Sequence, residues 1–310
     1  MNKRFIKYWK PLAAVCFWGA SFIATKIALS QLNPLNIIFI RLILASALLG
    51  TIALYTKRSF KISLKNHGFI FILALIAVFH LWIQVTGLKY TTASNTGWII
   101  GITPVFMAIL GFFVFSEKFT LFKITGILIA FFGLLLLISK GDFLSIDFIS
   151  KKGDFLILAS AFTWSVYSMV NKKITITYPP LMTILFQFLI MAVVIIPFNV
   201  NEPTIKIILH LSTEIWFALL FLGFFCSGIA YVLWAQSLKE MEAARVGAFL
   251  YFEPFVTVIA AWSILKEDIT LLTIISGITI TCGIILVNVN PKILFRYLNN
   301  YFMKKRLEQE

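Results

Sequence analysis

Long apolar runs alternate with short polar segments along the chain. A run of about 20 residues is needed to cross the hydrocarbon core of a bilayer as a helix, and ten runs reach or approach that length. They cover residues 12–32, 35–55, 68–88, 93–115, 119–138, 154–175, 180–198, 214–238, 243–265 and 270–289. Some connections are as short as QLNP, which forces neighbouring helices to be antiparallel. The pattern predicts an all-α integral membrane protein with ten transmembrane helices.

Composition supports a membrane protein over a nucleic-acid-binding one. Of 310 residues, 60% are hydrophobic and 13% are charged, whereas soluble domains carry about 25% charged residues. The net charge of +14 fits a multispanning protein, because such proteins collect Lys and Arg in cytoplasmic loops. We therefore expect the lipid bilayer as a partner and no nucleic acid.

The distribution of Lys and Arg predicts an orientation. Counted over the connecting segments, they are in clear excess on the side of the N-terminus, and such an excess marks the cytoplasmic side. We predict a multi-pass protein of the cell (inner or plasma) membrane with both termini cytoplasmic. Residues 290–310 would be a basic cytoplasmic tail, either lying on the inner membrane surface or solvated.

The residues that usually carry catalysis are scattered. Three cysteines lie in apolar runs without paired or metal-type spacing, the three histidines are far apart, and there is no GxSxG turn. We predict a protein that is not an enzyme, with no catalytic residues, no metal and no cofactor.

The chain contains an internal repeat. The segment FWGASFIATK resembles TWSVYSMVNK, and GITPVFMAILGFFVFSEKFT resembles YFEPFVTVIAAWSILKEDIT, each pair about 150 residues apart. The matched residues are Trp18 and Trp164, Pro104 and Pro254, and Glu117 and Glu267. Each copy holds five spans, an odd number, so the second copy must enter the membrane from the opposite side. We predict two inverted five-helix repeats, residues 12–138 and 154–289, an arrangement typical of secondary transporters.

Four stretches carry a family resemblance: FWGASFIATKIAL, IRLILASALL, TPVFMAILGFFVFSEKFTLFKITGILIAFFGLLLL and FEPFVTVIAAWSILKEDIT. They are similar to the two EamA-type halves of the drug/metabolite transporter superfamily, over about residues 12–289. The resemblance implies a permease with two EamA repeats, an exporter or carrier of small organic solutes such as amino acids and their analogues. It also implies that helices 1–4 and 6–9 surround a central cavity. The halves differ, since Gln187 stands where the first copy has Arg41.

Polar and aromatic residues on shared helix faces are candidates for lining that cavity, because residues three or four apart lie on one face. The candidates are Trp18, Ser21, Thr25, His80, Gln84, Trp98, Trp164, Tyr167, Asn171, Tyr231 and Trp234. The alternative for the tryptophans is packing or an interfacial belt. His80 is either a proton-coupling group or a buried histidine bonded to the backbone or Gln84.

Arg41 and Glu253 lie within spans and need a function or a partner, because a charge in the bilayer is costly. Arg41 matches the helix-2 arginine of the family, and either pairs with a carboxylate such as Glu267 or faces the cavity. Glu253 lies mid-span before Pro254, which removes a helix donor and opens the backbone there. It could bind a solute ammonium, carry a coupling proton, or hydrogen-bond inside the bundle in its protonated form. Arg41, Pro104, Pro254, Glu117 and Glu267 are the structural or coupling candidates.

The function predicted is a secondary transporter, an exporter of a small organic metabolite such as an amino acid or analogue, working by alternating access. A non-transporting structural or assembly protein and a channel are the alternatives. Matched polar faces in both halves argue against a scaffold, and polar stripes that stop mid-span argue against a channel. The sequence leaves proton coupling and a homodimer open.

Overall fold

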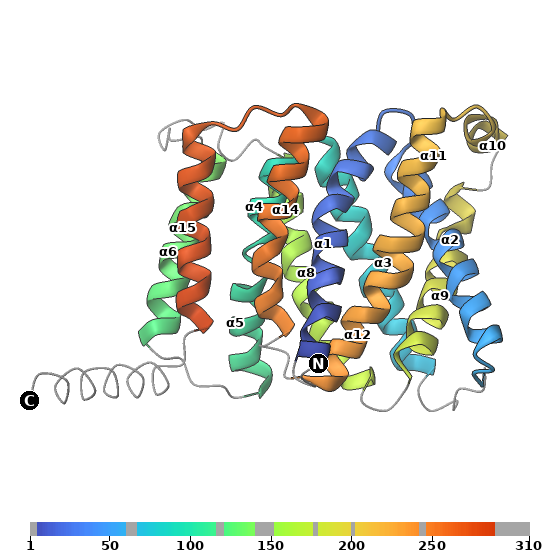
Figure 1. Ribbon diagram of the computed structural model, residues 1–310, viewed down its shortest axis with the longest axis horizontal. Coiled ribbons are helices and arrows are strands. Elements are labelled where there is room, and N and C mark those ends of the chain that lie inside the picture. Colours follow the sequence, from blue (N-terminus) through green and yellow to red (C-terminus); the bar gives the residue numbers. More distant parts are fainter. Residues whose placement is uncertain are drawn as a thin grey trace, which may run out of the picture.

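The computed structural model describes residues 5–59, 67–115, 121–139, 152–175, 179–199, 202–241 and 246–288, and all regular elements within these ranges are helices. Figure 1 shows most of them standing side by side with their axes roughly parallel. The first part of the chain forms α1 (Phe5–Ala28), α2 (Pro34–Tyr55), α3 (His67–Lys89), α4 (Ala93–Ile100), α5 (Thr103–Phe115) and α6 (Leu121–Ser139). The second part forms α8 (Lys152–Thr175), α9 (Pro180–Asn199), α10 (Glu202–Leu209), α11 (Thr213–Leu220), η2 (Phe221–Ile229), α12 (Ala230–Glu240), η3 (Ala248–Phe252), α14 (Glu253–Ala260), η4 (Ala261–Leu265) and α15 (Leu271–Asn288).

Six helical segments are long and apolar enough to cross a membrane, and three shorter apolar ones accompany them. The six are Tyr8–Ala28, Pro34–Tyr55, Gly68–Lys89, Lys152–Lys172, Pro180–Asn199 and Thr213–Glu240; the shorter ones are Ile124–Leu137, Phe249–Leu265 and Leu271–Gly283. Their outward faces carry large exposed apolar side chains such as Phe79, Phe132 and Trp262, far more than a soluble surface tolerates. These faces suit contact with lipid.

The run at residues 93–115, expected as one helix, is divided into α4 and α5 by a turn at residues 101–102. Pro104 explains the division, because its ring has no N–H to donate to the carbonyl of Ile100 and clashes with it in a continuous helix. The Thr103 hydroxyl donates to that carbonyl instead, with an O–O distance of 2.6 Å. The matching run in the second half changes from the 3₁₀ turn η3 to α14 at Glu253–Pro254.

The run at residues 214–238 forms a continuous rod whose middle third, η2, is wound as a π-helix. Two glycines of η2 face α2: a methyl group on Gly223 or Gly228 would collide with Leu44 or Leu48. A π-helical turn displaces the residues around it relative to an α-helix and is frequent at functional sites. The sequence pattern did not predict it.

Helix pairs from the two halves pack against each other through the whole bundle. α2 packs on α9, α6 on α15, α3 on α8, and α1 on α12, while α14 lies between α1 and α4. Glycines allow α14 to lie close to α1 and α4. A methyl group on Gly19 of α1 would come within 2.8 Å of Val256 Cβ, and one on Gly97 of α4 within 2.7 Å of Thr257 Cβ. Small residues bring helix backbones together in membrane proteins in this way.

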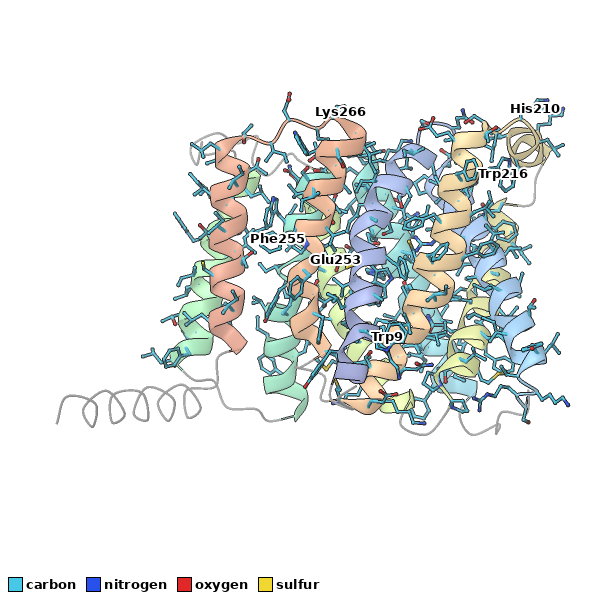
Figure 2. All side chains as sticks on the ribbon, viewed as in Figure 1. Trp9, His210, Trp216, Glu253, Phe255 and Lys266 are labelled. Carbon is cyan, nitrogen blue, oxygen red and sulfur yellow. The ribbon has the colours of Figure 1, made fainter. Side chains whose placement is uncertain are left out.

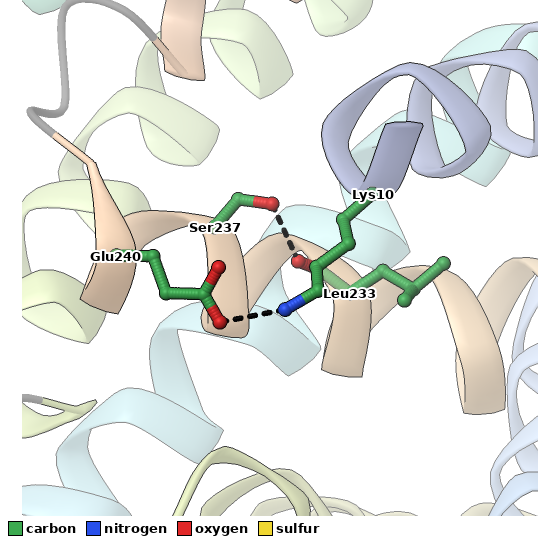
Figure 3. A network of polar contacts seen from close by, with 4 residues as sticks. All are labelled: Lys10, Leu233, Ser237 and Glu240. Atoms are coloured by element: carbon green, nitrogen blue, oxygen red, sulfur yellow. Dashed lines mark hydrogen bonds and ion pairs between the residues drawn. The ribbon is translucent and has the colours of Figure 1, made fainter. Parts of the chain in front are cut away.

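An ion pair joins the halves near the N-terminal end of α1. Lys10 Nζ lies 2.6 Å from Glu240 Oε1 at the end of α12, and the Ser237 hydroxyl donates to the Leu233 carbonyl one turn earlier (Figure 3). Both charged side chains are partly exposed, so the pair contributes little to stability. The predicted Glu117 and the predicted tail at residues 290–310 lie outside the described residues.

Candidate functional site

A small cavity of about 30 Å³ lies inside the bundle where seven helices converge. Its lining comes from α1, α2, α3, α4, α8, α12 and α14 and consists of Trp18, Ser21, Phe22, Arg41, His80, Leu81, Gln84, Ile100, Trp164, Tyr231 and Glu253. Figure 2 labels Glu253 at mid-height, between Trp9 near one end of the bundle and Lys266 at the other. Both halves of the chain therefore contribute polar groups to one shared space.

An aromatic cluster forms one wall of the cavity. The rings of Trp18 and Trp164 meet edge to face with centroids 4.9 Å apart, and Tyr231 lies 5.6 Å from each. The Trp18 indole N–H donates to the carbonyl of Cys226 at 3.0 Å, in η2. The cluster fixes the orientation of α1 relative to η2 and presents ring faces and edges to the cavity.

Arg41 brings a buried cation to the cavity. Its side chain is 3% exposed, and its Nε donates to the Ser227 hydroxyl of η2 at 2.8 Å. Neither Glu267 nor any other carboxylate of the described residues lies within ion-pair distance of it. Its two terminal nitrogens therefore remain available to a ligand.

Glu253 brings a buried carboxylate to the same cavity from α14. The residue is 4% exposed, and its backbone is fully used, since its N–H donates to Leu250 and its carbonyl accepts from the Thr257 hydroxyl at 2.9 Å. No hydrogen bond from another described residue reaches its carboxyl group. Burying such a group without partners is costly, and a ligand or water in the cavity would offset that cost.

His80 and Gln84 add two polar groups from one face of α3. His80 Nδ1 lies 3.0 Å from the carbonyl of Ser160 and 3.3 Å from the Thr163 hydroxyl. Since a carbonyl only accepts, this contact assigns the proton to Nδ1 and leaves Nε2 as an acceptor. His80 is thus bonded to the backbone of α8, and its second nitrogen has no partner among the described residues.

Several predicted residues lie behind the aromatic wall and do not line the cavity. Tyr167 donates to Gln187 Oε1 at 3.1 Å and accepts from Asn171 Nδ2 at 3.2 Å, all three being fully buried. Trp234 packs edge to face on Trp18 at 5.2 Å, and the Thr25 hydroxyl donates back to Ser21. These groups support the lining rather than contribute to it.

Trp98 and Glu267 serve helix packing and capping. The Trp98 ring lies against Gly277 of α15 and edge to face with Phe255 at 5.5 Å. The Glu267 carboxylate accepts from the backbone N–H groups of Ala93 and Ser94 at 2.9 and 3.0 Å, and from the Ser94 hydroxyl at 2.7 Å. A carboxylate at a helix N-terminus satisfies free N–H groups and complements the helix dipole.

Sequence reasoning missed the residues that organise the cavity from η2, as well as its apolar lining. Ser227 holds Arg41, and Cys226 accepts from Trp18 while its thiol donates to the carbonyl of Phe17 at 3.3 Å. The two glycines in FLGFFCSGIA were a usable sign of close approach, but nothing in the spacing indicates a π-helical turn. Phe22, Leu81 and Ile100 read as ordinary apolar positions.

Comparison with known proteins gives the family. The profile of the EamA-like transporter family matches residues 8–139 and 151–289. An uncharacterized transporter of Archaeoglobus fulgidus is 32% identical over 273 residues, 87% of this chain and 92% of that protein. The probable amino-acid metabolite efflux pump of Escherichia coli is 26% identical over 283 residues, 88% of this chain and 91% of that protein.

A solved structure shares the fold. A crystal structure matches with a TM-score of 0.70 at 18% identity, covering 94% of this chain and 98% of that chain. A helical bundle with lipid-suited faces around an internal polar cavity fits a multi-pass membrane protein. The chain belongs to the EamA-like transporter family.

Proposed function

We propose that this protein is a secondary transporter that exports a small organic metabolite, such as an amino acid or analogue, by alternating access. The observation that carries the proposal is the mid-height cavity lined by polar and aromatic residues of both halves. A site near the midplane at the contact between repeats is what alternating access requires. The name of the Escherichia coli relative, an amino-acid metabolite efflux pump, supports this class of solute.

The packing of helices supports ten spans in two inverted repeats, residues 12–138 and 154–289. If the two halves are exchanged, α3 takes the place of α12 and α8 takes the place of α1, so the contact between α3 and α8 becomes the contact between α12 and α1. The pairs α2–α9 and α6–α15 each consist of two repeat partners and are unchanged by the exchange. In this arrangement both termini are cytoplasmic in the cell membrane. Cysteine labels at Lys57 and Lys206 should then react from opposite sides of intact cells, and labelling of both from one side would refute the inverted arrangement.

Counterflow in liposomes tests the function. Purified protein is reconstituted into vesicles loaded with one unlabelled metabolite, and entry of the labelled form is followed over time. A carrier shows transient accumulation above equilibrium, a channel shows only equilibration, and a structural protein shows neither. Repeating the assay with an imposed pH gradient tests proton coupling, for which Glu253 and His80 are the candidate groups.

A further inference from the structure

Contacts between the two halves close the two ends of the bundle in different ways. At one end, the end of α3 meets the start of α8 by backbone packing. A methyl group on Gly153 would come within 2.7 Å of the carbonyl carbon of Tyr90. The Thr91 hydroxyl donates to the Asp154 carboxylate at the same place, and Lys152 Nζ lies 5.3 Å from the centroid of the Tyr90 ring. Parting these two helices would separate closely packed backbones.

The opposite end, where α12 meets α1, is held at its outermost turn by the ion pair between Lys10 and Glu240. Figure 2 labels Trp9, the neighbour of Lys10, far from Lys266, and Glu267 binds the start of α4 next to the end of α3. The two charged side chains are 18% and 35% exposed. Water and salt therefore reach the pair, and such pairs are weak and are screened by salt. This contact can break without separating packed backbones (Figure 3).

Both partners of this ion pair are attached to weak points of their helices. Pro11 directly follows Lys10 inside α1, and proline cannot donate to the carbonyl four residues earlier, so the helix is prone to bend there. Glu240 is the last residue of α12, and Met241 after it is already extended, with φ −136° and ψ 162°. Either side chain can therefore move away without unwinding the middle of a helix.

Two buried polar groups between this end and the cavity have no hydrogen-bond partner in the described part of the chain. They are the indole N–H of Trp234 and the hydroxyl of Ser168, and both residues are 1% exposed. Trp234 lies one turn beyond Tyr231 toward the end of α12, and Ser168 lies one turn beyond Trp164 on α8. Unsatisfied buried groups raise the free energy of the closed arrangement. Water that entered from the α1–α12 end would satisfy both.

We propose that the Lys10–Glu240 ion pair is a latch that keeps the cavity shut toward the end of the bundle that carries the N-terminus. When the latch breaks, α1 and α12 part and water reaches Trp234 and Ser168, while the α3–α8 end stays closed. The proposal rests on the proposed transport function and names one contact that regulates it. Because the latch is a partly exposed ion pair, ionic strength sets how often it is open.

The reactivity of one buried cysteine tests the latch. Ser168→Cys is introduced with and without Glu240→Gln, and the detergent-purified proteins are treated with a small water-soluble methanethiosulfonate. Peptide mass spectrometry follows position 168 separately from the native cysteines. The matched control is Ser160→Cys, which is also buried on α8 and lies one turn from Trp164 toward the α3–α8 end.

We expect Glu240→Gln to increase the rate of modification at position 168 about 2- to 5-fold, as loss of a partly exposed ion pair allows. Position 160 should react slowly in both backgrounds. High salt, about 1 M, should raise the rate at position 168 in the protein with the ion pair and have little effect in Glu240→Gln. Unchanged reactivity at position 168, or an equal increase at both positions, would overturn the proposal.

A charge exchange shows whether the ion pair itself is responsible. Lys10→Glu alone should increase the rate at position 168, because it places two carboxylates together, and adding Glu240→Lys should restore the slow rate. Lys239→Gln removes an exposed charge next to Glu240 and should leave the rate unchanged. An exchanged pair that still reacts fast, or an equally large effect of Lys239→Gln, would refute the latch.

The counterflow assay separates this proposal from the proposed function. Counterflow by the unmodified protein, with reactivity at position 168 unaffected by Glu240→Gln, would uphold the transporter and overturn the latch. Latch-dependent reactivity without counterflow of any metabolite would uphold the latch and overturn the transporter.

Discussion

The two halves interrupt a helix at the same repeat position, before Pro104 and before Pro254, yet they satisfy the interruption differently. In the first half the Thr103 side chain donates to the free carbonyl of Ile100. In the second half the backbone N–H of Glu253 donates to the carbonyl of Leu250. The backbone alone thus closes the second break, which leaves the Glu253 carboxyl free to face the cavity. One half uses the position for structure, and the other makes it available to a ligand.

At the repeat position held by Arg41 and Gln187 the roles of the two halves are reversed. Here the first half supplies the residue that lines the cavity, and the second half supplies the structural one. Arg41 of the first half reaches across to Ser227 and into the cavity. Its counterpart Gln187 is sealed inside the second half, bonded to Tyr167 at 3.1 Å and to the Met191 sulfur at 3.6 Å. Each half therefore contributes one ionisable side chain to the cavity, and the duplicated position in the other half is structural. Duplication provided two equivalent positions, and divergence made them complementary.

The largest effect expected is loss of transport in Glu253→Gln. The variant keeps the shape of the side chain but removes its ability to ionise, and a hydrogen bond to a charged group is worth about 1.5–3 kcal/mol, or roughly 10- to 100-fold in rate. Counterflow should fall by that factor while the melting temperature stays near that of the unmodified protein. A variant with full transport and an unchanged pH profile would place Glu253 with Thr103 among the structural residues.

A second prediction concerns the glycines that precede the two breaks, Gly97 and Gly247. A methyl group on Gly97 would lie 2.7 Å from Thr257 Cβ, whereas one on Gly247 would lie 3.4 Å from the flexible Met107 sulfur. We expect Gly97→Ala to cost about 1–3 kcal/mol through overpacking. Gly247→Ala should be neutral or slightly stabilising, because alanine favours the helix. Thermal unfolding in detergent compares them, and equal melting temperatures would contradict the tight packing of α4 on α14.

A third prediction tests whether the Thr103 hydroxyl stabilises the helix break before Pro104. Thr103→Val removes the hydroxyl that donates to Ile100 at nearly constant volume. An unsatisfied buried carbonyl costs about 1–3 kcal/mol, so the melting temperature should fall while the affinity for solute changes little. Thr103→Ser keeps the hydroxyl and should recover most of the loss. If Thr103→Ser melted as low as Thr103→Val, the hydroxyl would not be what supports the break.

The smallest effect expected is at the N-terminal end of α4. Glu267→Gln weakens the acceptor that binds Ala93, Ser94 and the Ser94 hydroxyl. N-terminal caps contribute about 0.5–2 kcal/mol, and an amide oxygen keeps part of this. A small drop in melting temperature is expected, together with faster hydrogen exchange confined to the first turn of α4. A large drop would mean that Glu267 also holds the halves together.

The sequence by itself determined the helical class, the positions of the runs and the duplication, and it singled out Glu253 as a candidate site residue. These follow from local properties: apolar length, helical period, the missing N–H of proline, and the cost of a charge among apolar residues. The same reasoning identified Trp18, Ser21, His80, Gln84, Trp164 and Tyr231, which the structure brings to the cavity.

Only the tertiary structure decided which members of a shared helix face reach the cavity. Ser21 lines it while Thr25, one turn away, does not, and Trp98 packs on Gly277 instead. Helical period assigns a face but not the neighbour that covers it, and that neighbour depends on where glycines let backbones approach. The anchoring of Arg41 by Ser227 depends further on the π-helical turn η2, which joins α11 to α12 and packs against α2. This local winding has no mark in the apolar pattern of either half.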